Sequence, residues 1–153
     1  MSTIIQTTPI YSINPHHDQC RQCRANLFKK HVVDDAAWEL CHQGPETTEH
    51  FFECRFAAQF WASLGLQIRA GFRANDLHCI SRPASIPDTE FSSYILLCCW
   101  QIWKRRNNHV FRGDTANLQQ VVRACREEAT SWAYRLRRDI VWVANVWCSS
   151  FAM

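Results

Sequence analysis

The sequence predicts a mainly α-helical protein in which a small N-terminal lobe is followed by two long helices that pack as an antiparallel hairpin. Apolar residues recur at intervals of three and four in several segments, which is the period of an amphipathic helix. No stretch alternates for long between apolar and polar residues, so strands should be few and confined to the lobe. With 153 residues, of which 47% are hydrophobic and 20% charged, the chain can bury a core of its own.

The first part of the chain is predicted to contain an arm and the small lobe. Residues 1–19 include two prolines and show no helical period, which indicates an extended N-terminal arm. Residues 20–66 form the predicted lobe. Its first element is a short helix between about Cys20 and Val33 that would turn Leu27 and Phe28 inward.

A second helix is predicted to complete the lobe. It would begin after Thr47 or Thr48, because a hydroxyl group there can accept the free backbone N–H groups of the first turn, and it would end at Gly65. Its apolar positions are Phe51, Phe52, Phe56, Ala57, Phe60, Trp61 and Leu64. Residues 67–87, which contain two prolines and a glycine, are predicted to be an irregular linker.

The helical hairpin is predicted to occupy residues 88–153. Its first helix would be capped by Asp88 or Thr89 and would end at Gly113. The apolar side of that helix contains Phe91, Tyr94, Ile95, Cys98, Ile102 and Trp103.

The other helix of the hairpin would begin after Asp114 or Thr115 and pack its apolar stripe against the first helix. The stripe contains Leu118, Val122, Cys125, Ala129, Trp132 and Leu136. A less regular pattern continues through Ile140, Val143 and Trp147. It leaves open whether the helix continues or breaks near Arg138 and Asp139.

The nine cysteines are an odd number, and no stretch resembles a secretory signal peptide. We therefore expect a reducing intracellular location, in the cytoplasm or nucleus, with organelle targeting left open because the first 17 residues contain no acidic residue. Cys98, Cys99, Cys125 and Cys148 lie within apolar helical patterns and are expected to be buried as small hydrophobic side chains. The longest apolar run, residues 94–100, is too short to cross a bilayer, so no membrane insertion is expected.

Three residues of the lobe have the spacing of metal ligands. His50 and Cys54 are four residues apart, so on a helix they project from one face, and Cys41 precedes them in a loop. Zinc prefers four thiolate or imidazole ligands in a tetrahedron. The natural fourth ligand would lie three residues before Cys41, but that residue is Trp38, which cannot coordinate. The lobe is thus predicted to be degenerate and zinc-knuckle-like.

Three outcomes are compatible with this spacing. In the first, one Zn²⁺ recruits a substitute fourth ligand from Cys23, Cys20, His42 or His31. In the second, the site holds no cofactor and Trp38 fills the vacated volume, so that burial of the indole stabilises the lobe by about 2–3 kcal/mol. In the third, the three ligands and a water molecule form a weak site.

Basic residues in the second half form a separate candidate site. Residues 1–90 contain eight Lys and Arg against ten Asp and Glu, whereas residues 91–153 contain nine against four. Trp100, Trp103 and Phe111 alternate with bases in a mixture that can contact phosphates and stack on nucleic-acid bases. The basic candidates are Lys104, Arg105, Arg106, Arg112, Arg135, Arg137 and Arg138. The competing interpretation places the aromatic residues in the core and the basic residues in solvent.

Motifs that would indicate catalysis are missing from the sequence. It contains no glycine-rich phosphate loop, no nucleophile elbow and no His-Glu-x-x-His. Its acidic residues are scattered, and Glu46, Glu49 and Glu53 are expected to be solvated first-turn charges. We therefore expect a protein that is not an enzyme.

Two motifs resemble the C-terminal region of plant non-LTR retrotransposon reverse transcriptases, known as the reverse-transcriptase zinc-binding domain. Residues matching the knuckle motif of that family are Cys41, Glu46, Thr47, His50, Cys54, Ala57 and Trp61, with Trp38 in place of its first Cys. Residues matching its downstream Trp-x-x-Trp-Lys-x-Arg-Asn signature are Trp100, Trp103, Lys104, Arg106 and Asn107. The similarity runs from about Arg24 to the end of the chain.

The resemblance implies an accessory role in nucleic-acid binding beside a polymerase. The polymerase aspartates, an endonuclease and one metal ligand are missing here, which favours a retroelement fragment retained in a plant for another task. We therefore expect a non-enzymatic module that binds a protein partner, as an inhibitor, a self-protecting factor or a regulator. The alternative is a nucleic-acid-binding accessory module with a zinc knuckle, acting on RNA or DNA.

Overall fold

The computed structural model describes residues 24–38, 40–47, 49–115, 117–134, 138 and 141–152. The predicted arm at 1–19, and Cys20 and Cys23, lie outside the described residues. The described part of the chain is mainly helical, and its one extended pairing is an isolated bridge between Ala37 and Pro45, inside the lobe as predicted. None of its helices is long and apolar enough to cross a membrane.

The α-helices follow one another along the chain in two groups. The N-terminal group contains α1 (Arg24–Lys29), α2 (His50–Glu53) and α3 (Arg55–Ser63). The C-terminal group contains α4 (Phe91–Arg112), α5 (Leu118–Ala133) and α6 (Val141–Ser150). Two short 3-10 helices, η2 (Ala74–Cys79) and η3 (Asp88–Glu90), lie between the groups.

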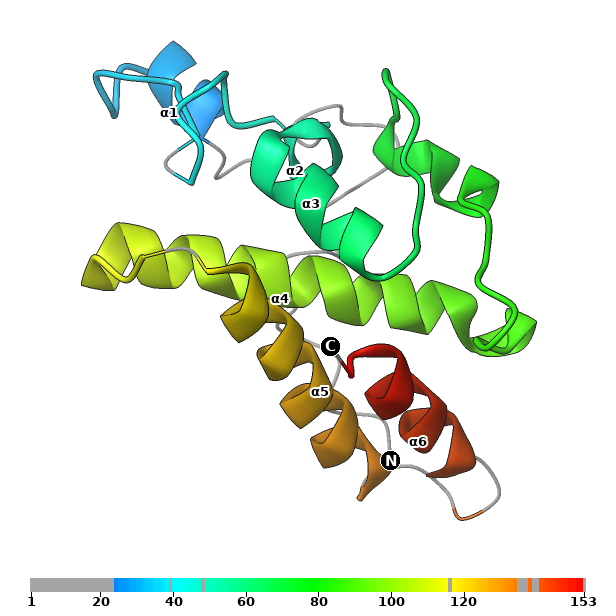
Figure 1. The fold of residues 1–153 in the computed structure, drawn as a ribbon. Coiled ribbons are helices and arrows are strands. Elements are labelled where there is room, and N and C mark those ends of the chain that lie inside the picture. The colour runs from blue at the N-terminus through cyan, green and yellow to red at the C-terminus, as the bar shows by residue number, and fades with distance from the viewer. Residues whose placement is uncertain are drawn as a thin grey trace, which may run out of the picture.

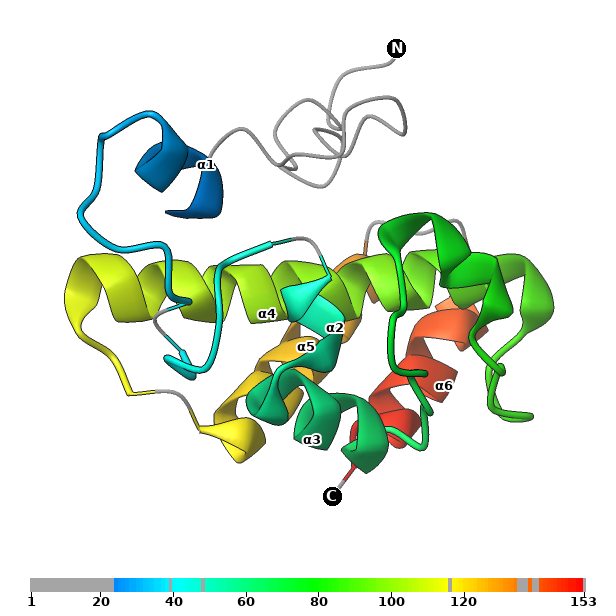
Figure 2. The same ribbon diagram turned by 90° about the horizontal axis from the view of Figure 1, so that it is seen from above.

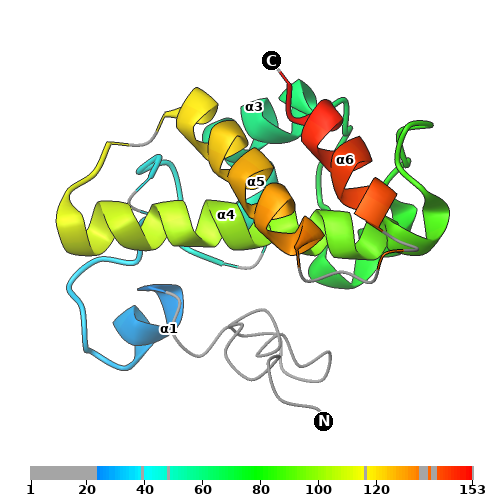
Figure 3. The same ribbon diagram turned by 90° about the horizontal axis from the view of Figure 1, so that it is seen from below.

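The long helix α4 crosses the molecule, with α2 and α3 on one side of it and α5 and α6 on the other (Figure 1). The view from above shows α1 at the opposite edge of α4 from α3 (Figure 2). Helix α5 crosses α4 obliquely, and α6 returns beside α5 (Figure 3). Helix α5 also contacts α3, so it links the lobe to the C-terminal helices.

The predicted hairpin is formed by α4 and α5. Helix α4 ends at Gly113, which has a left-handed backbone (φ 69°) that glycine adopts without strain, as its sequence predicts. The cap of α5 differs from the prediction, because Asn117 and not Asp114 or Thr115 accepts the Gln119 N–H (2.9 Å). The start of α4 also differs, since Asp88 and Thr89 belong to η3 and α4 begins at Phe91.

The apolar stripe of the second hairpin helix does not continue as one helix. Helix α5 ends at Ala133, and α6 begins at Val141. Helix α6 packs Trp147 against Tyr94 of α4 and Trp132 of α5. The break therefore adds a third, shorter helix to the predicted pair.

Two local predictions for the lobe were wrong. The helix predicted after Thr47 is interrupted at Cys54, whose extended backbone (φ −62°, ψ 156°) separates α2 from α3. The reason is that Cys54 caps α3, because its Sγ accepts the Ala57 N–H (3.3 Å). Phe28 was predicted to point inward but is 46% exposed, since the short helix α1 buries Asn26 instead.

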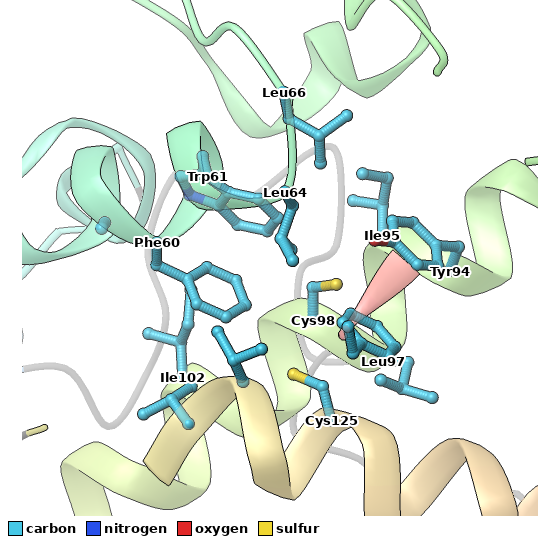
Figure 4. Close-up of a cluster of buried hydrophobic side chains, with 14 of the residues drawn as sticks. Phe60, Trp61, Leu64, Leu66, Tyr94, Ile95, Leu97, Cys98, Ile102 and Cys125 are labelled. Atoms are coloured by element: carbon cyan, nitrogen blue, oxygen red, sulfur yellow. The ribbon is translucent and has the colours of Figure 1, made fainter. Parts of the chain in front are cut away.

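The lobe and the C-terminal helices share one hydrophobic core. Figure 4 shows its centre, where Phe60 and Trp61 of α3 face Cys98 and Ile102 of α4. The segment between the two groups contributes to the same core through Phe72, Ile80 and Ile86, which are all buried. Residues 67–87 thus contain no α-helix but do pack against the helices on both sides.

The cysteines of the helices are buried largely as predicted. Cys98 and Cys125 are fully buried between α4 and α5, whereas Cys99 and Cys148 are half-buried. Burial raises the pKa of the Cys98 thiol well above its ordinary value and that of Cys99 to about 12. The Cys98 and Cys99 thiols are therefore neutral packing groups at physiological pH.

Candidate metal centre

Cys41, His50 and Cys54 form a group that could hold a metal ion. Their ligand atoms all lie within 4.8 Å of one another, and Cys41 Sγ is 3.0 Å from His50 Nε2. Two thiols and an imidazole are the donors that zinc and other borderline or soft metal ions prefer. The structure thus brings together the three ligands that the sequence predicts.

A tight loop brings Cys41 to this group. The Trp38 N–H donates to the Gly44 carbonyl (2.8 Å), and the Trp38 carbonyl accepts the N–H groups of Cys41 (3.3 Å) and His42 (2.8 Å). The bridge between Ala37 and Pro45 closes the loop. Gly44 lies against the imidazole, because a Cβ atom there would be only 3.3 Å from His50 Cε1. The lack of a side chain at Gly44 therefore lets the loop approach His50 closely.

The helices α2 and α3 supply the other two donors. His50 is the first residue of α2, and its N–H donates to the Thr47 hydroxyl (3.3 Å), one of the two predicted caps. Cys54 precedes α3, where its Sγ accepts the Ala57 N–H. Cys41 Sγ similarly accepts the Gln43 N–H (3.4 Å). Backbone N–H groups directed at sulfur stabilise thiolate ligands and orient them.

Trp38 packs beside the ligand group. Its side chain is fully buried, with the indole in edge-to-face contact with the His50 ring (centroids 4.8 Å apart) and stacked on Phe51 (5.2 Å). The buried Trp38 Nε1–H has no hydrogen-bond partner in the described part of the chain. The indole therefore supports the imidazole from the side, as an apolar ring and not as a ligand.

The other predicted ligands are not part of this group. His42 and His31 are exposed, and both have left-handed backbones (φ 54° and 57°). Among the described residues, no His, Cys, Asp or Glu besides Cys41, His50 and Cys54 joins the group. Cys20 and Cys23 lie outside those residues.

The surroundings of Cys54 and His50 favour the neutral form of each side chain in the metal-free protein. Burial raises the pKa of the Cys54 thiol to about 12, an effect that backbone hydrogen bonds from Ala57 and Phe56 reduce. Burial also lowers the pKa of His50 below its ordinary value of 6.5, while the Glu53 carboxylate partly opposes the change. A bound cation would reverse the preference of the Cys54 thiol, since it attracts the thiolate form.

Glu46 was predicted to be a solvated charge, which was wrong, and Arg106, a candidate contact of the nucleic-acid alternative, is buried beside it. The two side chains form a buried ion pair, in which Arg106 donates to Glu46 Oε2 (2.7 Å), and they are only 8% and 4% exposed. The Arg24 N–H also donates to Glu46 Oε2 (2.6 Å). Burial of each charge is tolerated because the other neutralises it. The pair joins the metal-ligand loop to α4.

The remaining basic candidates that the structure describes differ in their surroundings. Lys104 pairs with Glu128 of α5 (3.5 Å), and Arg105 is half-buried. Arg112 and Arg138 are exposed, whereas Arg135 and Arg137 lie outside the described residues. Trp100 and Trp103 stack on each other (centroids 4.9 Å apart) and are half-buried.

Several large apolar side chains are exposed, which the sequence did not specify by position. Tyr134, after the end of α5, is 86% exposed, and Trp142, in the first turn of α6, is 52% exposed. The other exposed large apolar residues of the described chain are Phe28, Val32 and Phe111. Periodicity gave no signal for Trp142, because α6 is apolar on most of its circumference.

No family model, curated protein or solved structure matches the chain.

Proposed function

We propose that the protein is a non-enzymatic interaction module that binds another protein through the exposed aromatic side chains at the junction of α5 and α6. The observation that carries the proposal is the exposure of two large rings, Tyr134 (86%) and Trp142 (52%), on either side of one helix connection. Both rings flank the connection between neighbouring helices, with the exposed Arg138 between them in sequence.

Aromatic and arginine side chains are the commonest anchors of protein interfaces. Tyr, Trp and Arg are enriched among residues whose truncation costs most binding energy, because a large ring buries much area with little loss of side-chain entropy. Exposed rings of this size raise the free energy of an isolated protein, because hydration of apolar surface is unfavourable. A protein partner that covers Tyr134 and Trp142 would remove that cost.

The alternative, a nucleic-acid-binding accessory module with a zinc knuckle, has less support. Nucleic-acid affinity comes from several exposed Lys and Arg residues that displace counterions together. Here Arg106 is buried against Glu46 and Lys104 is paired with Glu128. The half-buried stack of Trp100 and Trp103 leaves each ring less face for a nucleic-acid base.

We further propose that one Zn²⁺ supports the lobe at Cys41, His50 and Cys54. The donor types, their mutual separation and the N–H groups directed at both sulfurs fit this ion. A metal ion would cross-link the loop that contains Cys41 to α2 and α3, and this loop has little apolar core of its own. Its role would be structural, since a zinc ion can contribute folding free energy directly to a small lobe.

The proposed origin, a fragment of a plant retroelement, rests on the two sequence motifs. The buried ion pair supports it, because Glu46 belongs to the first motif and Arg106 to the second. Two motifs that are 60 residues apart in sequence are thus parts of one structural unit.

The protein-partner proposal can be tested by comparing matched surface variants. The variant Tyr134→Ser with Trp142→Ser should lose a partner that wild-type protein captures from plant extract, as measured by quantitative mass spectrometry. Phe111→Ser, which changes a ring that is 77% exposed at the end of α4, is the control and should retain it. The purified partner should then bind the wild type directly, with an affinity at least about tenfold above that of the double variant, as expected for loss of interface anchors. Equal binding by all three proteins would contradict the proposal.

The nucleic-acid alternative can be tested by fluorescence anisotropy with single-stranded RNA and duplex DNA. We expect no saturable binding even at low salt. Binding that weakens steeply as salt rises, and that is reduced by Arg112→Ala or Arg138→Ala, would favour the alternative.

A further inference from the structure

The metal-ligand group provides three donors for an ion that prefers four. We propose that a zinc ion bound by Cys41, His50 and Cys54 retains one coordination position for an outside donor, and that this position reversibly binds the thiolate of a small-molecule thiol. This inference rests on the proposed zinc binding and goes beyond it, because it assigns a ligand from outside the chain.

The donor atoms are already close to the separation that a tetrahedral ion needs. Zinc lies about 2.3 Å from sulfur and about 2.0–2.1 Å from imidazole nitrogen, which places tetrahedral ligand atoms about 3.5–3.8 Å apart. The three atoms lie within 4.8 Å of one another, and the pair Cys41 Sγ and His50 Nε2 is at 3.0 Å. Small side-chain adjustments therefore suffice for three bonds to one ion.

The position from which a fourth ligand would come is occupied by Trp38. The loop hydrogen bonds place residue 38 directly behind Cys41, since the Trp38 carbonyl accepts the N–H groups of both Cys41 and His42. Its indole is fully buried against His50 and offers no lone pair to a metal. Within the described ranges, no further His, Cys, Asp or Glu belongs to the group.

The group is accessible from outside. Cys54 is buried, at 5% exposure, but Cys41 and His50 are only half-buried. A small solute can therefore approach the donors from the side of the Cys41 loop. The apolar neighbours of the group are Trp38, which contacts the His50 ring, and Phe51, which stacks on Trp38.

A thiolate is the donor best suited to this position. Adding one sulfur to two thiolates and an imidazole completes a Cys₃His-type set, which is a stable closed coordination for zinc. Sulfur also makes favourable contacts with aromatic rings, which a strongly hydrated carboxylate does not. On binding, the thiol releases its proton to solvent and its sulfur replaces a water molecule at the ion, with no change of oxidation state.

Cobalt substitution provides a direct test. The full-length protein loaded with Co²⁺ is titrated with reduced glutathione, and the sulfur-to-cobalt charge-transfer absorption is recorded. We expect a saturable increase in this absorption by about half, from two sulfur bonds to three, while the ion stays bound. Oxidised glutathione, which carries no thiol, should produce no change.

Two variants at one position serve as matched controls. Trp38→Cys supplies a thiolate from the chain, so its Co²⁺ form should show the higher absorption without glutathione and should not respond to it. Trp38→Phe retains an apolar ring and should respond as the wild type does. If Trp38→Cys fails to fold, X-ray absorption of the wild-type zinc form decides, with two sulfurs expected without glutathione and three with it.

Other results would overturn the inference in distinguishable ways. A Co²⁺ form that already has three sulfur bonds and ignores glutathione would show that another cysteine of the chain fills the position, and Cys20→Ser with Cys23→Ser would identify it. A loaded form with two sulfur bonds and no response would reject the thiol but leave zinc binding intact. Failure to bind any metal would remove the proposed zinc site as well, without bearing on the aromatic surface of α5 and α6.

Discussion

The segment 24–49 and the helices α4 to α6 are held in different ways. Among its described residues, the segment buries only Asn26, Trp38 and Glu46, two of which are polar or charged. The helices instead bury a continuous set of apolar side chains, in which Tyr94 packs on both Trp147 and Phe151. The stability of the segment 24–49 therefore depends on a few specific contacts, whereas that of the helices α4 to α6 depends on the packing of many apolar side chains.

The difference shows what a short segment needs when it cannot build a core. Glu46 links the loop to Arg24 and to Arg106 of α4, and the metal-ligand group links it to α2 and α3. The free energy that such contacts contribute depends on pH, on metal binding and on the presence of both partners, whereas the free energy of apolar burial depends on the area buried. The stability of the segment 24–49 should therefore vary with conditions that leave the helices α4 to α6 unchanged.

Substitution of the central ring of the helices should have the largest effect. Trp147 is 1% exposed and contacts Tyr94 and Trp132. Trp147→Ala should lower the free energy of unfolding by about 3–5 kcal/mol, because it leaves a large cavity. Urea denaturation measures the change. Trp142→Ala, which removes a half-exposed ring of the same helix, should lower the free energy of unfolding much less. Equal losses would mean that α6 is not held by Trp147.

Removal of one charge of the buried ion pair should come next. Arg106→Gln leaves the Glu46 carboxylate buried without its cation, which should cost about 3 kcal/mol. Replacing both residues, as Glu46→Gln with Arg106→Gln, should restore part of this loss, since no unpaired charge remains. Urea denaturation of the wild type, Glu46→Gln, Arg106→Gln and the double variant tests the coupling. Costs of the single variants that simply add in the double variant would show that the two residues act independently.

Removal of the proposed Zn²⁺ should affect the lobe selectively. At free Zn²⁺ 100-fold above its dissociation constant, binding would stabilise the folded protein by about 2.7 kcal/mol, which a chelator would abolish. Hydrogen exchange should then accelerate in residues 38–54 and remain slow in the centres of α4 and α5. Cys41→Ser should behave like the chelated wild type. A uniform acceleration of hydrogen exchange along the chain would contradict the proposed difference between the two regions.

Acid should produce the smallest effect, again in the lobe. The pKa of His50 in the folded protein is below 6.5 because the ring is partly buried, so the unfolded chain binds a proton more readily. This contribution to the stability of the metal-free protein is present above pH 6.5 and is lost as the pH falls through the folded pKa of His50. The loss should be small, since the ring is only partly buried.

Thermal unfolding of metal-free protein between pH 7 and pH 5 measures the effect. His50→Asn should reduce the pH dependence, whereas His42→Asn, which changes an exposed histidine, should not. An unchanged pH dependence in His50→Asn would assign the acid sensitivity to other groups.

Features that depend on neighbouring residues in the sequence could be predicted. The helical class, the end of α4 at Gly113 and the grouping of Cys41, His50 and Cys54 all follow from local spacing. The break at Cys54 could not be predicted, because the apolar period continues unchanged through it. That break depends on a sulfur atom acting as a helix cap, which periodicity does not report.

The amino-acid sequence by itself determined that this protein is helical and where its metal-ligand donors lie along the chain, since both depend on residues a few positions apart. Only the tertiary structure decided that Glu46 and Arg106, 60 residues apart, neutralise each other in the interior, and that Trp142 remains exposed while Trp147 is buried. The physical reason is that periodicity defines the apolar faces of a helix, whereas the packing of distant helices determines which faces are covered and which charges meet.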